Sequence, residues 1–562
     1  MRRFILGLTI LLLLSPMLWG MPPHPELMEK IQRGELKAPK HNLVVSDEEL
    51  AKAGFNPAQL KALSPARPKV AGPFNMLVIL VDFSDKNSQV APVFFDSLLF
   101  SQTQSSVRRY YDENSYGTFD LVTVNYPTST GWQRAPQAST WYANGLNGLG
   151  AYPQNAQKLV EEVVDLVNPV VNFANYDNNG DGYVDGIAVV HSGPGAELSG
   201  SPNDIWSHKW AIVPRLRDGV YIFNYSMEPE YWTSPGDMTI GVYCHEFGHA
   251  IGGLPDLYDT DGGSQGIGRW SVMAGGSWNG SLGSSPSHFD AWCKIEMGFA
   301  VAGVITTNQT GVNIPNVEQS NAGIFRLWTN GTIGPEYFLV ENRQRTGYDA
   351  SLPSSGLLIW HIDDTVSSGN TRPWYPPNSP SSGHYTVALV QSDNLFQLEK
   401  NLNSGNSGDP FPGSTVNRTF SASTTPNSNG YAGAGSLVQV TNISNSGSTM
   451  TADFSVQTPT DVDDDLFNRP KNFQLSQNYP NPFNPATVIS YSLEKSGPVE
   501  LDIFNLLGEK VKTLVSGRQG AGLHQENWDG TDQSGRPVSS GLYLYRLRLE
   551  KFAETKKMML VR

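Results

Sequence analysis

The five residues HEFGH, at positions 245–249, constrain this chain more than any other feature of its sequence. On an α-helix, residues four positions apart lie on one face, so both imidazoles could bind one metal ion. Glu246 follows the first histidine, where its carboxylate could take a proton from a water molecule that zinc activates. The alternative is a structural pair of histidines, but chance matches are rare with 10 histidines in 562 residues. We therefore expect a helix over residues 239–252 that carries a catalytic zinc site.

A catalytic zinc ion needs a third protein ligand and an open position for water. In the longer pattern of some zinc peptidases this ligand would fall at position 255, which is a proline here. Asp256 follows at once, after a Gly252-Gly253 pair that can end the helix, and it is our candidate. A turn residue that caps its own backbone is the other interpretation of Asp256. The remaining candidates for the third ligand are Asp259, Asp290 and Glu296.

Met273 stands in the segment WSVMAGG and is our candidate for a methionine turn beneath the metal. By itself, a methionine is more often a core side chain. His208 and His288 could stabilise an oxyanion or position substrate, but a structural role is favoured for both. No tyrosine lies between Met273 and Tyr337, so the residue that stabilises the oxyanion is left open.

A second metal motif is DNNGDGYVD, at residues 177–185. Oxygen donors at alternate positions, with Gly182 at the sharp turn, are typical of the start of an EF-hand loop that binds Ca²⁺. The closing glutamate of such a loop is absent, so a further ligand must come from elsewhere, and Glu197 is a candidate. A metal-free turn is the alternative. The expected ligands of a structural calcium ion are Asp177, Asn179, Asp181, Asp185 and the backbone carbonyl of Tyr183.

The N-terminus has the pattern of a secretory signal peptide. Arg2 and Arg3 precede an apolar run over residues 4–14, and Gly20 provides a small residue for cleavage. The run is short for a membrane span, which needs about 20 residues. We therefore expect the mature chain to be secreted or attached to the cell surface.

Changes of pattern along the chain indicate a multidomain protein. Residues 76–83 form an apolar run typical of a buried strand, and residues 156–167 have the period of an amphipathic helix. Strand-like runs follow at residues 337–340, 357–362 and 386–390, and Glu341, Arg343, His361 and Asp363 are expected to pair across strands. We expect a signal peptide (1–20), a pro-segment or N-terminal arm (21–70), an α+β catalytic domain (71–300), a β-rich domain (301–455), an acidic linker (456–470) and a β-sandwich (471–562).

Charge and cysteine content exclude several classes of protein. The formal net charge is −14, which argues against nucleic-acid binding through a basic surface. Two cysteines exclude a disulfide-dense scaffold. In an exported protein Cys244 and Cys293 could form a disulfide, and two buried free thiols are the alternative.

The segment HEFGHAIGGLPDLYD, at residues 245–259, resembles the M6 peptidases, the immune inhibitor A group. The similarity extends to NMLVILVDFSD, SVRRYYDENSYG, YDNNGDGYVDG, IWSHKW and GLLIWHID, and covers about residues 21–455. It implies a secreted zinc-dependent endopeptidase with a zincin or metzincin-like catalytic domain that acts on proteins or peptides. In that family an aspartate after Gly-Leu-Pro is the third zinc ligand. It corresponds to Asp256, although this chain has one more residue before that motif.

The C-terminal residues 471–562 resemble a type IX secretion sorting domain. The similarity lies in QNYPNPFNP, NLLGEKVKTLV, WDGTDQSGRPVSSGLYLYRL and the ending KKMMLVR. It implies an immunoglobulin-like sandwich that the outer-membrane export machinery recognises. A similar fold occurs in flagellar hook-capping proteins, so a purely structural β module is the alternative.

Two functions of different classes fit these features. The first is a secreted zinc metalloendopeptidase in which His245, His249 and Asp256 hold zinc and Glu246 is the base. The second is a cell-surface binding or adhesion protein with an inactive zincin domain. The intact HEFGH favours the first, because an inactive relative can keep its histidines and lose the glutamate.

Overall fold

The structure is a computed structural model that divides into two compact units, residues 1–458 and residues 459–562. Among the described residues, no helix has the length and apolar character needed to cross a membrane. The predicted signal peptide before Gly20 and the acidic linker residues after Thr458 lie outside the described residues. The structure describes residues 20–36, 45–56, 71–103, 105–367, 369–376, 378, 382–433, 435–458, 474–475, 477–478, 481–493, 496–520, 522–549 and 552–561.

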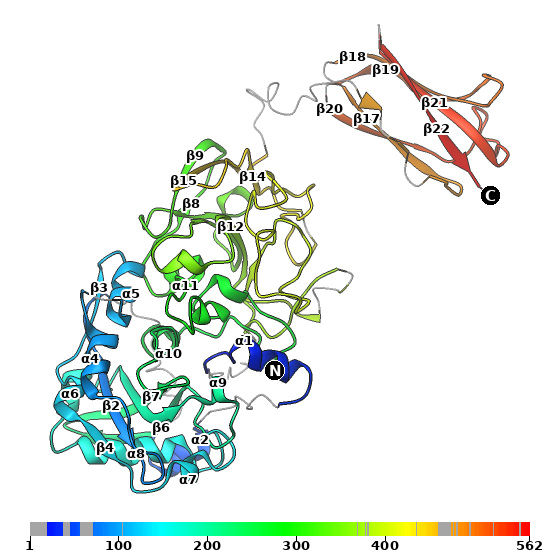
Figure 1. The fold of residues 1–562 in the computed structure, drawn as a ribbon. Helices are drawn as coiled ribbons and strands as arrows, with labels where there is room; N and C mark the ends of the chain where they lie inside the picture. Colours follow the sequence, from blue (N-terminus) through cyan, green and yellow to red (C-terminus); the bar gives the residue numbers. More distant parts are fainter. Residues whose placement is uncertain are drawn as a thin grey trace, which may run out of the picture. The chain divides into compact units, whose positions relative to one another are not determined.

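A five-stranded sheet with the order β4-β2-β5-β7-β6 forms the α/β part of the first unit (Figure 1). Four of its strands are parallel, and β6 pairs antiparallel with β7 at the edge. Strand β2 is buried at every position, as the apolar run predicted, and its residues alternate between two cores. The strands are β2 (Leu77–Asp82), β4 (Trp132–Arg134), β5 (Ile187–Pro194), β6 (His208–Arg217) and β7 (Val220–Tyr231), with a separate parallel pair β1 (Gly72–Asn75) and β3 (Phe119–Val122).

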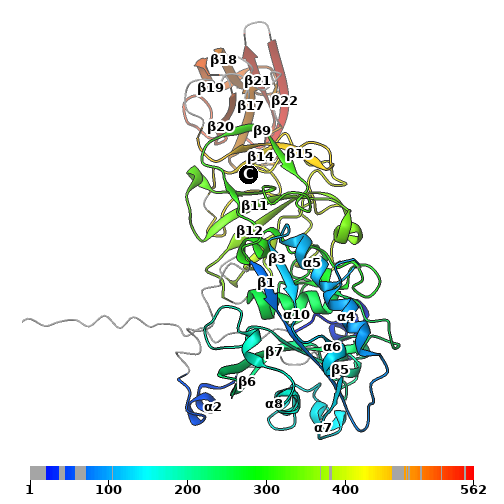
Figure 2. The same cartoon turned by 90° about the vertical axis from the view of Figure 1, so that its left-hand side faces the viewer.

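Helices α8 and α10 belong to the two different cores of this sheet (Figure 2). The side chain of Asn155 accepts a hydrogen bond from the Lys158 amide and begins α8, whose bounds are those predicted. The helices are α1 (Pro25–Gln32), α2 (Asp47–Lys52), α4 (Pro92–Phe100), α5 (Val107–Asn114), α6 (Pro127–Thr130), α7 (Ser139–Ala143), α8 (Ala156–Val167), η1 (Phe173–Tyr176), α9 (Ala196–Ser199), α10 (Gly241–Gly252), η2 (Gly268–Trp270), η3 (Gly275–Trp278) and α11 (Ala291–Glu296).

Residues after 300 are β-rich, as predicted, but they belong to the same compact unit as the α/β part. The core that contains Cys244 also contains Leu339 and Trp360, so apolar packing is continuous between the two parts. A five-stranded sheet, β13-β12-β11-β10-β8, and a three-stranded sheet, β14-β15-β9, enclose a further core. The elements are β8 (Gly303–Val304), β9 (Gln309–Pro315), β10 (Ile324–Leu327), η4 (Thr329–Gly331), β11 (Glu336–Arg343), η5 (Gly347–Ser351), β12 (Gly356–Asp363), β13 (Val387–Leu389), β14 (Gln439–Thr441) and β15 (Thr449–Ser455).

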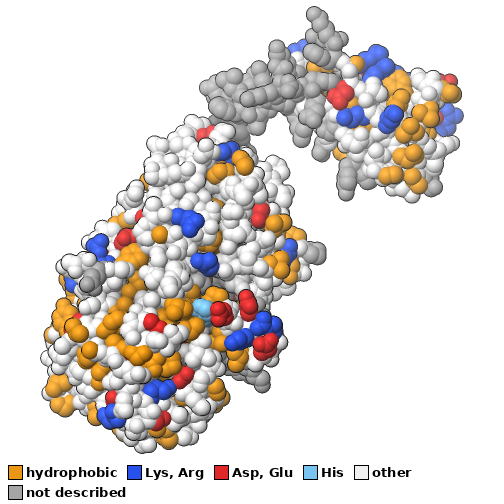
Figure 3. Space-filling view, viewed as in Figure 1, with side chains coloured by type: hydrophobic (Ala, Val, Ile, Leu, Met, Phe, Trp, Pro, Cys, Tyr) orange, Lys and Arg blue, Asp and Glu red, His pale blue; other side chains and the backbone are white. Residues whose placement is uncertain are grey.

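On the face in Figure 3, hydrophobic side chains gather over the α/β part, whereas the β-rich part shows mainly uncharged polar groups and backbone. The charged fraction of the whole sequence is only 16%. Val93, Val124 and Tyr126 are among the exposed apolar side chains of the α/β part.

The second unit consists of two antiparallel sheets, β16-β17-β20 and β19-β18-β21-β22. Side chains of both sheets, including Trp528 and Tyr545, share one buried core, so the sheets form the sandwich that the sequence predicts. The strands are β16 (Gln474–Leu475), β17 (Thr487–Leu493), β18 (Gly497–Phe504), β19 (Lys510–Gln519), β20 (Gly522–Trp528), β21 (Gly541–Leu549) and β22 (Phe552–Leu560).

Candidate active site

Helix α10 carries His245, Glu246 and His249, all buried. The Nδ1 atom of His245 lies 2.8 Å from the carbonyl oxygen of Val272, and that of His249 lies 2.7 Å from the carbonyl oxygen of Leu254. Because a carbonyl oxygen only accepts, each Nδ1 carries the proton and each Nε2 presents a lone pair. The two Nε2 atoms face each other at 3.1 Å, which is the arrangement of two ligands of one metal ion.

Asp256 is the acidic residue that joins these histidines. Gly253 adopts a left-handed conformation (φ 59°) that ends α10 and turns the chain back, which accommodates the additional residue. Asp256 Oδ1 lies 3.1 Å from Nε2 of His245 and 3.2 Å from Nε2 of His249. The other candidates do not join this group: Asp259 accepts from Ser264, Asp290 begins α11 by accepting from the Cys293 amide, and Glu296 lies at the end of α11.

The three side chains fit a divalent cation. Their ligand atoms all lie within 4.8 Å of one another and are buried. Asp256 Oδ1 has no hydrogen-bond partner among the described residues, although a buried carboxylate oxygen normally requires one. Two imidazoles and one carboxylate are a donor set typical of zinc.

Glu246 is a buried carboxyl group beside these ligands. Neither of its carboxyl oxygens has a hydrogen bond of normal geometry within the described part of the chain. Burial raises the pKa of Glu246 well above its usual value, and the nearby carboxyls of Glu228, Asp256 and Glu197 raise it further. The Lys209 side chain interacts electrostatically with Glu246, and burial lowers its pKa to about 8. The site is therefore rich in buried acids.

Met273, the candidate for a methionine turn, packs against helix α10. The turn around it closes through a hydrogen bond from the Ala274 amide to the carbonyl of Ser271. A Cβ atom at Gly248 would lie 2.6 Å from Met273 Sδ, so the thioether packs against the helix between the two histidines. Glycine at position 248 permits this approach, at a cost in helix propensity of about 1 kcal/mol.

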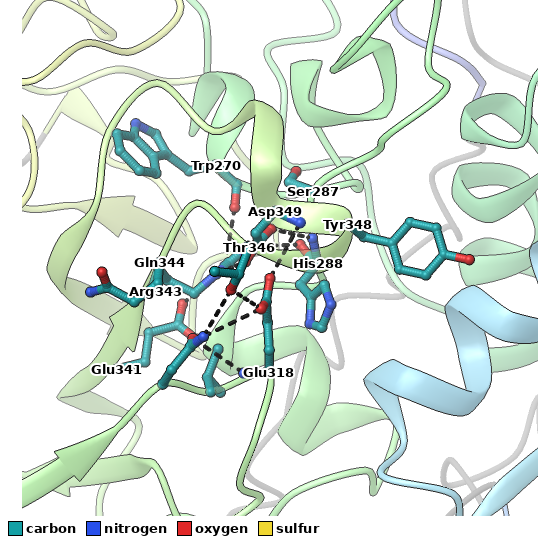
Figure 4. A network of polar contacts seen from close by, with 12 residues as sticks. Trp270, Ser287, His288, Glu318, Glu341, Arg343, Gln344, Thr346, Tyr348 and Asp349 are labelled. Carbon is teal, nitrogen blue, oxygen red and sulfur yellow. Dashed lines mark hydrogen bonds and ion pairs between the residues drawn. The ribbon is translucent and has the colours of Figure 1, made fainter. Parts of the chain in front are cut away.

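A buried ion-pair group holds the segment around this turn (Figure 4). Arg343 on β11 donates two hydrogen bonds to Asp349, at 2.6 and 2.7 Å, and its Nη1 lies 3.3 Å from Glu341 and from the carbonyl of Trp270. Asp349 also accepts from the amide of His288.

The expected cross-strand pairing holds for His361 on β12, whose Nε2 lies 3.0 Å from Glu336 on β11. It is wrong for Glu341 and Arg343, whose partners across β12 are Leu358 and Gly356, and for Asp363, which contacts His384.

The two histidines considered for the oxyanion have contacts at both ring nitrogens. His208 contacts the carbonyl of Trp206 through Nδ1 and the hydroxyl of Tyr225 through Nε2. His288 contacts Glu113 through Nε2 and Lys294 through Nδ1. These contacts support the structural role that the sequence favoured.

The disulfide considered between Cys244 and Cys293 is not formed in the structure. Both side chains are buried in the apolar core, on α10 and α11 respectively. Burial raises the pKa of the Cys244 thiol well above its usual value, which keeps it protonated and unreactive.

The segment from Gly20 to His24 lies across the site, and nothing in its sequence pattern signalled this position. The Gly20 amide lies 3.4 Å from Asp256 Oδ2, and the hydroxyl of Tyr258 donates to the Gly20 carbonyl at 2.6 Å. Met21 is completely buried, and its amide donates to the carbonyl of Ser207. Tyr258 was also missed, although it lies only two residues after Asp256.

Two tryptophans also hold this segment, and sequence reasoning gave neither a role. Trp206 Nε1 donates to the carbonyl of Met21, and Trp278 Nε1 donates to the carbonyl of Pro22, both at 2.9 Å. His24 packs edge-on against the Trp278 ring. The N-terminal segment is therefore bound through its backbone as well as through its side chains.

The acidic loop brings together the side chains predicted to bind calcium. Asp177 accepts hydrogen bonds from the amides of Gly180, Asp181 and Gly182, so its carboxylate points into the turn. The side-chain amide of Asn179 donates from Nδ2 to Asp181 and to Asp185, at 3.1 and 3.2 Å. Burial raises the pKa of Asp185 to about 6, and the charges of Asp181 and Asp177 add to the effect.

Two further parts of the calcium prediction have different outcomes. Tyr183 lies in the same loop, where its amide donates to Asp181. The suggestion that Glu197 completes the loop is wrong, because Glu197 accepts from the amide and the hydroxyl of Ser207. The eight residues of β5 separate it from the loop and extend over about 26 Å.

Comparison with known proteins gives two family matches. The family model that matches residues 74–300 is described as the immune inhibitor A peptidase M6 catalytic domain. Residues 484–551 match the FlgD Ig-like domain. The solved structure of FlgD from P. aeruginosa is 25% identical, with a TM-score of 0.11, over 13% of this chain and 57% of that one.

Two curated relatives are similar to the first unit. The pre-pro-metalloprotease PrtV of Vibrio cholerae serotype O1 is 26% identical over 355 residues, which is 55% of this chain and 36% of that protein. Immune inhibitor A of Bacillus thuringiensis subsp. alesti is 32% identical over 219 residues, which is 32% of this chain and 30% of that protein. The chain thus spans about a third of the length of these relatives. Together, the family match and the relatives support an M6 peptidase catalytic domain, of the immune inhibitor A type, over residues 74–300.

Proposed function

We propose that this chain is a secreted zinc-dependent metalloendopeptidase that hydrolyses peptide bonds of extracellular proteins. The observation that carries this proposal is the convergence of three buried ligand atoms, from His245, His249 and Asp256, beside the carboxyl group of Glu246. The match to a peptidase catalytic domain over residues 74–300 supports the same reaction class.

In this proposal Glu246 acts as general base and then as general acid. When bound, zinc supplies a Lewis acid that polarises the substrate carbonyl and lowers the pKa of water. Glu246 takes a proton from the attacking water molecule and later gives it to the nitrogen of the leaving amine.

We also propose that the N-terminal segment must leave before a protein substrate can bind. Met21, the first residue after the predicted signal peptide, is buried, and its backbone is hydrogen-bonded to Ser207 and Trp206. A substrate would need the same backbone partners. This supports assigning residues 21–70 to a pro-segment rather than to a permanent arm.

The test is hydrolysis of a protein substrate by purified chain whose N-terminal segment has been cut at a protease site placed between residues 36 and 45. The wild type with zinc should cleave, and removal of zinc should abolish cleavage. Glu246→Gln should be inactive, whereas the matched variant Glu162→Gln, on the far helix α8, should retain activity. An inactive wild type that is folded, metal-loaded and free of its segment would favour the binding or adhesion function instead.

We further propose that the loop of residues 177–185 binds a structural calcium ion. The inward carboxylate of Asp177 and the raised pKa of Asp185 support this, since a cation would relieve the repulsion between the acids. The ligand set is the one predicted from the sequence without Glu197.

For the second unit, we propose a role in export through type IX secretion machinery. The support is the sequence resemblance of residues 471–562 together with the two-sheet sandwich. Deletion of residues 471–562 in a host with this machinery should leave the protein inside the outer membrane. Unchanged export of the truncated chain would favour a purely structural module.

A further inference from the structure

We infer that Tyr258 is a catalytic residue, whose hydroxyl binds the carbonyl oxygen of the scissile peptide and stabilises the negative charge that develops there. The inference rests on the proposed peptidase function. The sequence leaves the residue that stabilises the oxyanion open. Tyr258 lies before Met273 and therefore outside the range 273–337, which contains no tyrosine between its ends.

The N-terminal segment shows where a peptide backbone lies in this site. Gly20 pairs antiparallel with His208 at the beginning of β6, which is the edge strand of the sheet. The backbone N–H of Met21 donates to the carbonyl of Ser207, and the Met21 carbonyl accepts from Nε1 of Trp206. Addition of an extended peptide to a sheet edge is a general mode of peptide recognition. The segment therefore occupies the place that a substrate backbone would take.

Within this segment, the peptide bond between Gly20 and Met21 lies at the reacting groups. The backbone N–H of this bond, which belongs to Met21, faces the Glu246 carboxyl group, but the two do not form a hydrogen bond of normal geometry. The carbonyl oxygen of this bond, which belongs to Gly20, accepts a hydrogen bond from the Tyr258 hydroxyl at 2.6 Å. The backbone N–H of Gly20 lies 3.4 Å from Asp256 Oδ2. In amide hydrolysis the carbonyl oxygen gains charge and the nitrogen gains a proton. The structure thus places the Tyr258 hydroxyl at the carbonyl oxygen and the proposed acid, Glu246, at the amide nitrogen.

The surroundings of Tyr258 hold its ring in a fixed place. The residue is 4% exposed, and its ring centre lies 6.4 Å from that of His245. The adjacent Leu257 amide donates to the carbonyl of Met273, which ties this segment to the turn beneath the metal ligands. A Cβ atom at Gly266 would lie 2.6 Å from Tyr258 Cα, so the backbone is also packed from the other side. A donor held in this way needs no reorganisation during the reaction.

The step balances without loss of the tyrosine proton. Water oxygen forms a bond to the carbonyl carbon, its proton passes to Glu246, and the π electron pair moves onto the carbonyl oxygen. The Tyr258 hydroxyl donates a stronger hydrogen bond to that oxygen but keeps its proton, since a phenol has a pKa near 10. The carbon–nitrogen bond then breaks, and the proton held by Glu246 passes to the amine.

The decisive variant is Tyr258→Phe in the full chain, activated by cutting its N-terminal segment. Loss of one oxyanion donor should lower kcat about 10²- to 10³-fold, while KM changes by less than about threefold. Zinc content and thermal unfolding should match the wild type. A phosphinic peptide, which resembles the tetrahedral intermediate, should bind more weakly by a factor similar to the loss in kcat/KM.

The matched control is Tyr243→Phe, which removes a buried hydroxyl from the catalytic helix itself, where it donates to the carbonyl of Pro229. Its kcat should stay within a few-fold of the wild type. A second readout needs no activity, and it uses chain produced without residues 1–19 so that Gly20 is kept. In metal-free chain of this kind, cut between residues 36 and 45, Tyr258→Phe should release the N-terminal fragment faster than wild type or Tyr243→Phe.

The outcomes separate this inference from the proposed function. An active wild type, an inactive Glu246→Gln and a fully active Tyr258→Phe would overturn the role of Tyr258 alone. A loss of kcat in Tyr258→Phe that comes with loss of zinc would make the tyrosine structural and would also overturn it. An inactive wild type would instead contradict the proposed peptidase function.

Discussion

Two groups of buried charges lie in the first unit, and they differ in how their charges are paired. In the group around Arg343, the guanidinium is paired with Asp349 and Glu341, and Asp349 accepts further hydrogen bonds. In the group around Glu246, the carboxyl oxygens have no well-formed hydrogen bond among the described residues, and three further acids are near. Burial affects both groups, but they differ in how the charges are matched. Arg343 makes direct hydrogen bonds to Asp349, whereas Lys209 acts on Glu246 only through its charge, without a hydrogen bond to the Glu246 carboxyl oxygens among the described residues.

This difference separates a structural cluster from a reactive one. An ion pair held by direct hydrogen bonds can fix the relative positions of chain segments, here β11 and the segment around Trp270. Buried carboxyl oxygens and imidazole lone pairs that face one point without hydrogen-bond donors are costly unless a cation binds. The pattern of satisfied and unsatisfied groups therefore indicates which cluster binds a ligand.

The largest expected effect is that of Glu246→Gln, which should separate activity from stability. Loss of the general base should lower kcat about 10³- to 10⁴-fold. The free energy of unfolding of the metal-free chain should change little, because glutamine keeps the size of the side chain and the carboxyl group that it replaces has no hydrogen-bond partner among the described residues. Denaturant unfolding beside the kinetic assay checks both. A large loss of stability would mean that Glu246 stabilises the fold, as the charges around Arg343 do.

Arg343→Met should have the opposite effect. It leaves Asp349 and Glu341 buried without their counter-charge and should lower the free energy of unfolding by about 3 to 5 kcal/mol. The activity per folded molecule should change little. In the double variant Arg343→Met with Asp349→Leu, much of this stability should return. If the single variant is as stable as the wild type, the pairing has no structural role.

Sequence patterns were sufficient for the parts of this protein that depend on local spacing. The helix over 156–167 and the proximity of His245 and His249 follow from a helical period, and Asp256 follows from ligand chemistry. The Arg343 pairing could not be obtained in this way, because its partner Asp349 lies in a turn that no periodicity describes.

The occupation of the site by Gly20 and Met21 was also beyond the sequence. These residues lie more than two hundred positions from Asp256 and are held largely by backbone hydrogen bonds, which depend little on residue type. Tyr258 remained hidden for a related reason. Its role depends on which carbonyl oxygen its hydroxyl reaches, and only the three-dimensional arrangement shows that.

A smaller effect is expected for Gly248→Ala, which tests the packing beneath the reactive group. The added methyl group would meet Met273 Sδ at 2.6 Å and the Phe289 ring at 3.2 Å. We expect a loss of about 1 to 3 kcal/mol in stability and weaker zinc binding, since the helix must shift. Met273→Leu, which keeps the volume, should cost less than about 1.5 kcal/mol. Calorimetry and zinc titration measure both, and a stabilised Gly248→Ala would contradict the packing.

The smallest effect concerns Asp185, which belongs to a third, partly exposed group of acids. Its pKa of about 6 exceeds the ordinary value of 3.8, so between these values the folded chain binds more protons than the unfolded chain. Stability without calcium should therefore fall as pH rises from about 4 to about 6. Calcium should remove this fall, and Asp185→Asn should flatten it. A pH-independent melting temperature in calcium-free buffer would contradict the assignment.

The central claim is that the cluster with unsatisfied charges is a metal site built from His245, His249 and Asp256. Its most direct test is the zinc stoichiometry of the metal-free chain by calorimetric titration, with Asp256→Asn compared with Asp259→Asn. We predict one tightly bound zinc ion in the wild type and in Asp259→Asn, and binding at least tenfold weaker in Asp256→Asn. Equal zinc affinity in all three proteins, or loss only in Asp259→Asn, would contradict the account.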